Sequence, residues 1–196
     1  AASLPVRHHV RMATDDTGTL WTIGHSTRPW DVFLGMLHDA RIGTLVDVRR
    51  FAGSRRNPQF SGETMARELP IAGIEYVAAP DLGGRRKADP ETHNTAWRNA
   101  SFRGYADYMM TADFNAALKE LLSLARQATT AIMCAEAVPW RCHRSLVGDA
   151  LLVHGYTVRD IMSMTSAPEH KLTSFAKVDG SNITYPFDPN SSSKDS

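Results

Sequence analysis

The chain has 196 residues, a length that favours one domain with a sizeable hydrophobic core. Its 42% hydrophobic and 22% charged residues are typical of a globular protein, and its net charge of +1 gives no overall bias toward nucleic acid. No apolar run approaches the roughly 18 residues of a membrane span. Two cysteines are too few for a secreted disulfide scaffold, so we predict a cytoplasmic protein without a membrane partner.

The hydrophobic pattern predicts strands and helices in alternation. Short apolar runs indicate strands, in chain order at residues 20–23, 44–48, 74–77, 130–133 and 156–161. Apolar residues at helical spacing indicate helices at residues 30–40, 63–69, 105–126 and 142–154. Strands separated by helices form parallel sheets. The predicted fold class is therefore α/β, a single domain of about five mostly parallel strands with helices on both faces.

Three regions are expected along the chain. Residues 1–18 form an N-terminal extension and residues 19–162 form the α/β domain. The tail, residues 163–196, is rich in Ser, Thr, Pro and Asp, so we expect it to be partly extended or disordered.

Polar and charged residues follow four of the predicted strands. They occupy residues 24–28, 47–50, 80–87 and 134–136. Ligands of parallel α/β sheets bind outside the carboxyl ends of the strands. We therefore expect these four turns to converge on one site at that rim.

The densest of these turns continues into residues 134–144, which contain both cysteines of the chain. Cys142 is expected to open a helix, whose N-terminal dipole lowers the pKa of a thiol. Residues at the rim that can act as acid, base or nucleophile form the candidate catalytic set, which is Cys134, Glu136, His25, Asp47, Cys142 and His143. Each also has a structural interpretation, the thiols as small packing residues and the carboxylates as capping or paired groups.

Asp47 interrupts an apolar strand, where an isolated carboxylate is costly. Its expected partner is Arg49 or Arg144, and the sequence leaves open whether the pair is structural or catalytic.

Arginines are concentrated in residues 49–56, and planar guanidinium groups suit phosphate or carboxylate. A solvated loop surface is the alternative interpretation. Together with polar neighbours at the rim, they define the candidate substrate-binding set, which is Ser26, Arg49, Arg55, Arg56, Asn57 and Arg144.

Several motifs occur in one order along the chain: IGHST at residues 23–27, VDVR at 46–49, SRRNPQF at 54–60, and CAE at 134–136 with CHR at 142–144. From about residue 20 to residue 161 the sequence resembles the DUF488 family. That family has no known function, so the resemblance implies an α/β fold and these site residues but no reaction. Six residues separate Cys134 from Arg141, where a cysteine-phosphatase loop has five, and this disfavours phosphatase chemistry.

Three functional hypotheses follow. The favoured one is an enzyme that acts on an anionic substrate bearing phosphate. This substrate would be a small molecule such as a nucleotide, or a nucleic acid. The arginines would hold phosphate, and Glu136, Asp47 and His25 would supply acid and base. The first alternative is thiol chemistry, with Cys134 or Cys142 as nucleophile.

The second alternative is a metal- or ligand-binding module without turnover. Its zinc ligands would be Cys134, Cys142, His143 and His25. Seven residues separate the two cysteines, which is not a common zinc-finger spacing, so no cofactor is expected. The sequence leaves the oligomeric state open.

Overall fold

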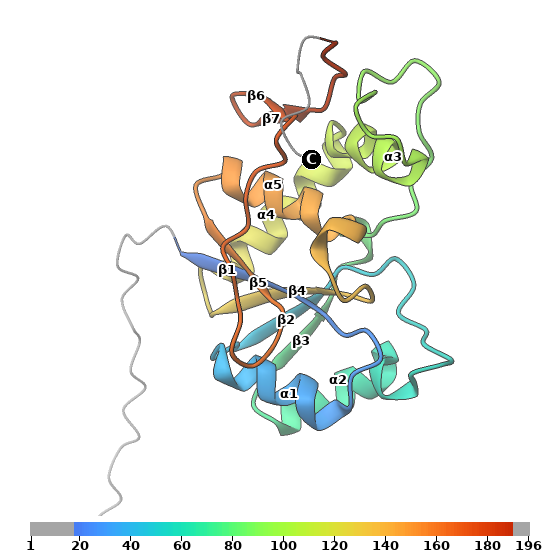
Figure 1. Ribbon diagram of the computed structural model, residues 1–196. Helices are drawn as coiled ribbons and strands as arrows, with labels where there is room; N and C mark the ends of the chain where they lie inside the picture. Colours follow the sequence, from blue (N-terminus) through green and yellow to red (C-terminus); the bar gives the residue numbers. More distant parts are fainter. Residues whose placement is uncertain (1–17, 190–196) are drawn as a thin grey trace, which may run out of the picture.

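The computed structural model describes residues 18–189 (Figure 1). Its main sheet has five strands, all parallel, in the order β3-β2-β4-β1-β5. In chain order the strands are β1 (Thr19–Gly24), β2 (Thr44–Asp47), β3 (Glu75–Ala78), β4 (Thr130–Cys134) and β5 (Thr157–Ile161). The helices of the described residues are α1 (Trp30–Asp39), α2 (Gly62–Ile71), α3 (Ala100–Met109), α4 (Ala112–Ala125) and α5 (Arg144–Val153).

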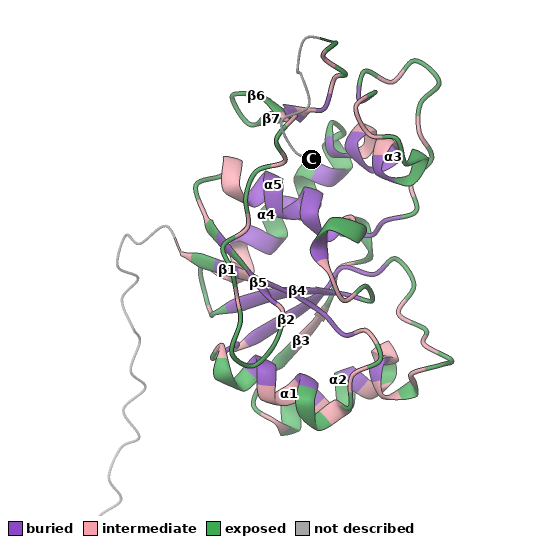
Figure 2. Cartoon of the chain, in the orientation of Figure 1, coloured by how far each residue is buried: buried purple, intermediate pink, exposed green. Residues whose placement is uncertain are grey.

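Helices cover both faces of the sheet, as predicted. α1 and α2 pack on one face through a core that includes Phe33, Met65 and Leu69. α3, α4 and α5 lie on the opposite side, where Leu118 and Leu146 belong to a second core. Burial is concentrated in the central strands and on the helix faces turned toward them (Figure 2). The single α/β domain is thus confirmed.

Two predicted helices have different boundaries in the structure. The helix expected at residues 105–126 begins at Ala100 and is two helices, separated by Met110 and Thr111. The Thr111 hydroxyl accepts a hydrogen bond from the Phe114 amide. This cap starts a new helix. The last helix begins at Arg144 rather than Cys142, because a short 3₁₀ turn, η3 (Pro139–Arg141), comes first.

The C-terminal segment, residues 163–189, runs back across the domain. It contains a small antiparallel hairpin, β6 (Lys177–Asp179) and β7 (Asn182–Thr184), and β7 contacts α3. Ile183 and Tyr185 are buried in the same core as α4 and α5. Most of the predicted N-terminal extension, and residues 190–196 of the predicted tail, lie outside the described residues. Within the part described, no helix combines the length and apolar character needed to cross a bilayer.

The topology creates an opening at the carboxyl ends of β2 and β4. These strands are neighbours, but α2 follows β2 on one face and α5 follows β4 on the other. In α/β sheets the crevice between such diverging connections is where ligands bind. On the other side of β4, the end of β1 is closed. A Cβ on Gly24 would lie 1.7 Å from the Glu136 carbonyl oxygen, so only glycine fits there.

Candidate functional site

A cavity of about 390 Å³ opens at this rim, within the size range of small-molecule sites. The ends of β2 and β4, the loop after β3, and the start of α3 and α5 surround it. Its lining residues are Arg49, Arg50, Phe51, Gly84, Arg85, Asn99, Ser101, Phe102, Cys134, Ala135, Glu136, Arg141, Cys142 and His143.

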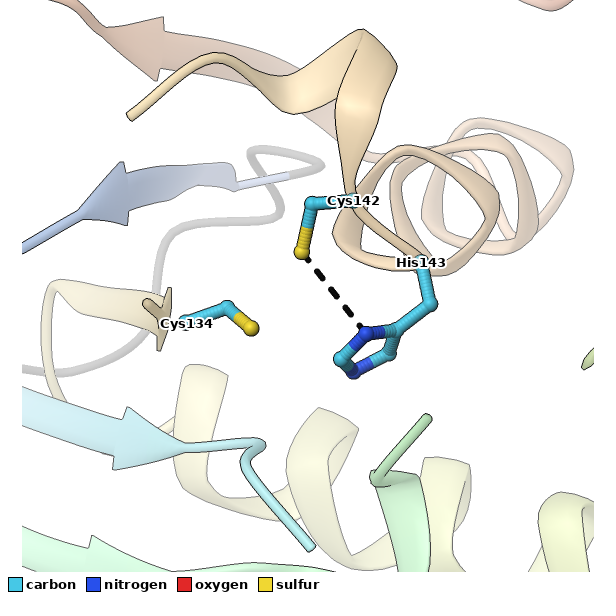
Figure 3. A group of neighbouring side chains, drawn as sticks. All are labelled: Cys134, Cys142 and His143. Carbon is cyan, nitrogen blue, oxygen red and sulfur yellow. Dashed lines mark hydrogen bonds between the residues drawn. The ribbon is translucent and has the colours of Figure 1, made fainter. Parts of the chain in front are cut away.

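Two thiols and an imidazole converge in this cavity (Figure 3). The ligand atoms of Cys134, Cys142 and His143 all lie within 4.8 Å of one another. The Cys142 sulfur lies 3.6 Å from Nδ1 of His143 and accepts a hydrogen bond from the Arg144 amide at 3.4 Å. Both cysteines are buried and free, with 7% of Cys134 and 4% of Cys142 exposed.

The orientation of the His143 ring is fixed by its other nitrogen. Nε2 lies 3.1 Å from the Val48 carbonyl oxygen, to which it donates a hydrogen bond. The ring also packs against Tyr105, with centroids 4.9 Å apart, and the Tyr105 hydroxyl donates to the Leu82 carbonyl. Because Nε2 donates to a carbonyl, Nδ1 is the ring nitrogen that faces the sulfurs.

The two thiols have opposite pKa shifts. The hydrogen bond from Cys142 lowers the pKa of Cys134 well below its ordinary value, aided by His143 and by the charge of Arg144 and opposed by burial. The same hydrogen bond, together with burial, raises the pKa of Cys142. Cys134 is therefore the thiol of the pair that ionises, while Cys142 stays protonated and donates a hydrogen bond to the Cys134 sulfur.

Positive charge surrounds the opening. Arg50, Arg85 and Arg141 line the cavity with exposed side chains, against one lining carboxylate, Glu136. The first turn of α3, capped by Asn99, also faces the cavity, and helix N-termini favour anions. The cavity is therefore suited to an anionic ligand.

The comparisons with known proteins assign the family. The model of the domain of unknown function DUF488 matches residues 29–151, more than half of the chain. The chain belongs to the DUF488 family. Every lining residue of the cavity falls inside the matched range, whereas β1 and β5 fall outside it. No curated protein and no solved structure matches the chain.

Other predicted site residues of this DUF488 protein build the frame of the cavity. Asp47, 1% exposed, accepts hydrogen bonds from Nε and Nη2 of Arg49, the latter at 2.6 Å, and from the Tyr76 hydroxyl at 2.7 Å. Nη1 of Arg49 donates to the Phe60 carbonyl. Arg49 is thus the partner of Asp47, and Asp47 does not line the cavity.

His25 is buried beside the cavity, and both of its ring nitrogens have partners outside the thiol pair. Its Nδ1 donates to the Ser26 carbonyl at 2.8 Å, its Nε2 lies 3.2 Å from Nη1 of Arg49, and its ring stacks on Phe60 at 4.4 Å. Burial is the largest cause that lowers the pKa of His25, so the neutral ring is favoured. Neither His25 nor Ser26 lines the cavity.

Arg144 is 1% exposed and does not line the cavity either. Its guanidinium donates to the Thr22 hydroxyl and to the carbonyl groups of Glu136 and Ala137, at 3.0, 3.0 and 3.4 Å. Arg144 therefore holds the turn between β4 and η3 in place and adds positive charge behind the thiols.

The arginine-rich loop contributes less than the sequence suggested. Arg55, Arg56 and Asn57 lie outside the cavity lining, and Arg49 and Arg50 are the arginines of this loop that reach it. Arg85, Arg141 and the start of α3 were missing from the predicted set. Arg141 lay within the cysteine stretch, and Arg85 follows the Gly83-Gly84 pair, so both positions carried a signal in the sequence.

Proposed function

We propose that this protein is a cysteine-dependent enzyme that acts on an anionic substrate in the arginine-lined cavity. The observation that carries the proposal is the convergence of Cys134, Cys142 and His143 in one cavity. The exposed cationic side chains that line this cavity are Arg50, Arg85 and Arg141. A thiolate with a depressed pKa beside an imidazole and cationic groups is the environment of a reactive cysteine.

This arrangement supports thiol chemistry over the acid–base set of Glu136, Asp47 and His25. Of those three residues only Glu136 lines the cavity. Asp47 is occupied by Arg49 and Tyr76, and His25 by the Ser26 carbonyl and Arg49. A general base has to reach its proton within hydrogen-bond distance or through one water, which favours His143 over both.

The proposed reaction begins when Cys134 passes its proton to His143 and the thiolate attacks an electrophilic carbon of the substrate, one that carries a leaving group and is double-bonded to nitrogen or oxygen. The carbon–sulfur bond forms, and the leaving group departs with the proton from His143. Water then adds its hydroxyl to the same carbon and gives its proton to His143, and the carbon–sulfur bond breaks, which restores the thiolate and leaves oxygen in place of the leaving group. Such chemistry needs reduced thiols, and the cytoplasm supplies that condition.

Alkylation with a charged and a neutral reagent tests the proposal. We expect iodoacetate and iodoacetamide to label Cys134 with a pH midpoint clearly below the ordinary thiol value of about 8.5. The labelling rate with iodoacetate, relative to that with iodoacetamide, should be higher than for an ordinary thiol because the cavity attracts anions. Replacing Arg85 or Arg141 by Gln should lower the iodoacetate-to-iodoacetamide rate ratio by about 3- to 10-fold each. The readout is mass spectrometry of the labelled peptide.

Arg55→Gln and Arg56→Gln are matched controls, because both arginines are exposed and lie outside the cavity lining. They should leave the ratio unchanged. A midpoint near 8.5 for both cysteines, or an equal response to all four substitutions, would refute the proposal.

A metal centre is the second candidate function, because the same three ligand atoms lie within 4.8 Å of one another. Two sulfurs and one nitrogen with an open fourth position resemble a catalytic zinc site. His25, the fourth ligand considered from sequence, is not part of this cluster and has both ring nitrogens engaged, and the charge of Arg144 favours a thiolate over a bound cation. One equivalent of zinc in protein purified without chelator, lost in Cys142→Ser, would favour this candidate over the nucleophile.

A further inference from the structure

Two large aromatic side chains remain exposed next to the arginines. Phe51 lines the cavity and is 65% exposed, and Trp140, also 65% exposed, directly precedes the lining residue Arg141. Neither ring has a place in the hydrophobic cores. By contrast, Trp97, just before α3, and Tyr105 and Tyr108, within it, pack in or against the core. Exposed aromatic rings beside cations are the surfaces on which unpaired bases stack.

Phe51 is flanked by two guanidinium groups. The Cζ atoms of Arg50 and Arg85 lie 5.9 and 5.8 Å from its ring centroid, and Nη1 of Arg50 lies 3.4 Å from the Arg85 carbonyl oxygen. Arg85 holds this position with φ of 59°, a left-handed conformation that residues other than glycine rarely adopt. Such backbone strain persists where the surroundings enforce it, and it is concentrated at ligand sites.

Trp140 belongs to a second cavity next to the first. This neighbouring cavity, of about 410 Å³, is lined by Pro139, Trp140 and Met162 among others. The two cavities share the η3 turn as their wall, with Arg141 on one side and Pro139 and Trp140 on the other. A ligand that uses both aromatic rings therefore has to continue across η3, which a chain of several units does and a single nucleotide does not.

We propose that the substrate is a single-stranded nucleic acid, a deepening that rests on the proposed function. Its phosphates contact Arg50, Arg85 and Arg141, one base stacks on Phe51, and a base beyond η3 stacks on Trp140. A duplex does not fit this pattern, because its bases stack on one another and leave no face for a side chain. The net charge of +1 agrees with local rather than overall attraction.

Fluorescence anisotropy with a labelled 12-nucleotide DNA strand tests this inference. Replacing Phe51 or Trp140 by Ala should weaken binding by about 5- to 100-fold, the range of one base stacked on an aromatic ring. Phe187→Ala is the matched control, because that ring is 67% exposed on the C-terminal segment, and it should bind like the unchanged protein. Arg85→Gln should reduce the slope of log affinity against log salt by about 0.7, one phosphate contact to a single strand.

An abasic strand of the same length and its duplex complete the design. Both should bind at least about 5-fold more weakly than the normal strand. Equal binding of the abasic strand, or tighter binding of the duplex, would overturn the inference. If no strand binds while iodoacetate selectivity persists, the nucleic-acid inference fails and the proposed function stands. If the strand binds through Phe51 and Trp140 but Cys134 is unreactive, the proposed function fails and binding stands.

Discussion

At the scale of single residues, burial decides what each arginine does. Arg49 and Arg144 are 8% and 1% exposed, and their guanidinium groups donate hydrogen bonds to other groups of the protein. Arg50, Arg85 and Arg141 are exposed at the cavity. A buried guanidinium is stable only when its charge and donors are satisfied, so the first two arginines belong to the frame of the cavity, whereas the other three present their charges to it.

Gly84 sets how closely the loop after β3 approaches His143. A Cβ at this position would lie 2.8 Å from Nδ1 of His143, closer than real contacts allow. We expect Gly84→Ala to displace the imidazole without unfolding the protein. The alkylation rate of Cys134 at pH 6 should fall by about 10-fold, which corresponds to an activation free energy higher by about 1.4 kcal/mol.

Gly53→Ala is the control, since a Cβ there meets nothing within 4 Å. Circular dichroism and the alkylation rate should both be unchanged in that variant. An alkylation rate in Gly84→Ala equal to that of the unchanged protein would show that His143 does not activate the thiol.

At the scale of secondary structure, the sequence predicted the elements better than their arrangement. Apolar runs located all five strands of the main sheet. The signal is clearest in β2 and β4, which are buried along their whole length, because strands buried on both faces have no polar alternation. The strand order β3-β2-β4-β1-β5 depends on contacts between distant segments, which local patterns do not contain. The break before α4 was present as Thr111, but the apolar spacing continues through it and concealed the cap.

The sequence likewise predicted where the site residues lie along the chain better than where their side chains point. The rule of strand ends brought Cys134, Glu136, Cys142 and His143 to the correct rim, because their positions follow from β4 and the turn after it. It placed His25 and Asp47 at the rim as well, but the direction of a side chain depends on its partners. Phe60 and Arg49 hold His25, and Arg49 and Tyr76 hold Asp47.

His170 attaches the C-terminal segment to the main domain. Its Nδ1 lies 2.9 Å from Asp160 at the end of the sheet, and its Nε2 lies 3.4 Å from Asp149 on α5. Burial alone would lower the pKa of His170, but hydrogen bonds to Asp149 and Asp160 and their charges raise the pKa to about 9. Only the protonated ring presents a donor to both carboxylates.

This contact makes stability depend on pH. Because the folded pKa of about 9 exceeds the ordinary 6.5, the stabilisation is complete below pH 6.5 and is lost as pH rises through 9. The shift corresponds to roughly 3 kcal/mol. We expect the difference in unfolding free energy between the unchanged protein and His170→Gln, measured in urea, to shrink by about that amount from pH 6 to pH 10. A difference independent of pH would contradict a charged His170.

At the scale of the whole molecule, a continuous line of polar contacts joins the cavity to the C-terminal segment. Arg144 donates to the Thr22 hydroxyl, which donates to Asp160 at 2.6 Å, and Asp160 contacts His170. His170 contacts Asp149, which accepts a hydrogen bond from the Tyr185 hydroxyl at 2.9 Å. Charges of opposite sign alternate along this line, which allows a row of ionised groups to be buried together.

Thr22 is the link whose loss separates the two halves of that line. Replacing it by Val keeps the shape but leaves both the Arg144 Nε and an Asp160 oxygen without their partner, at a cost of about 1–3 kcal/mol for each. Thr22→Ser keeps the hydroxyl and loses one methyl group, at a cost of about 1 kcal/mol. The unfolding free energy measured in urea should therefore be lower for the Val variant than for the Ser variant, the reverse of the order that their hydrophobicity predicts.

Since Arg144 also holds the turn beside Cys134, alkylation of Cys134 at pH 6 should slow in the Val variant and not in the Ser variant. Equal stability of the two variants would mean that the line of contacts carries no coupling between the cavity and the C-terminal segment.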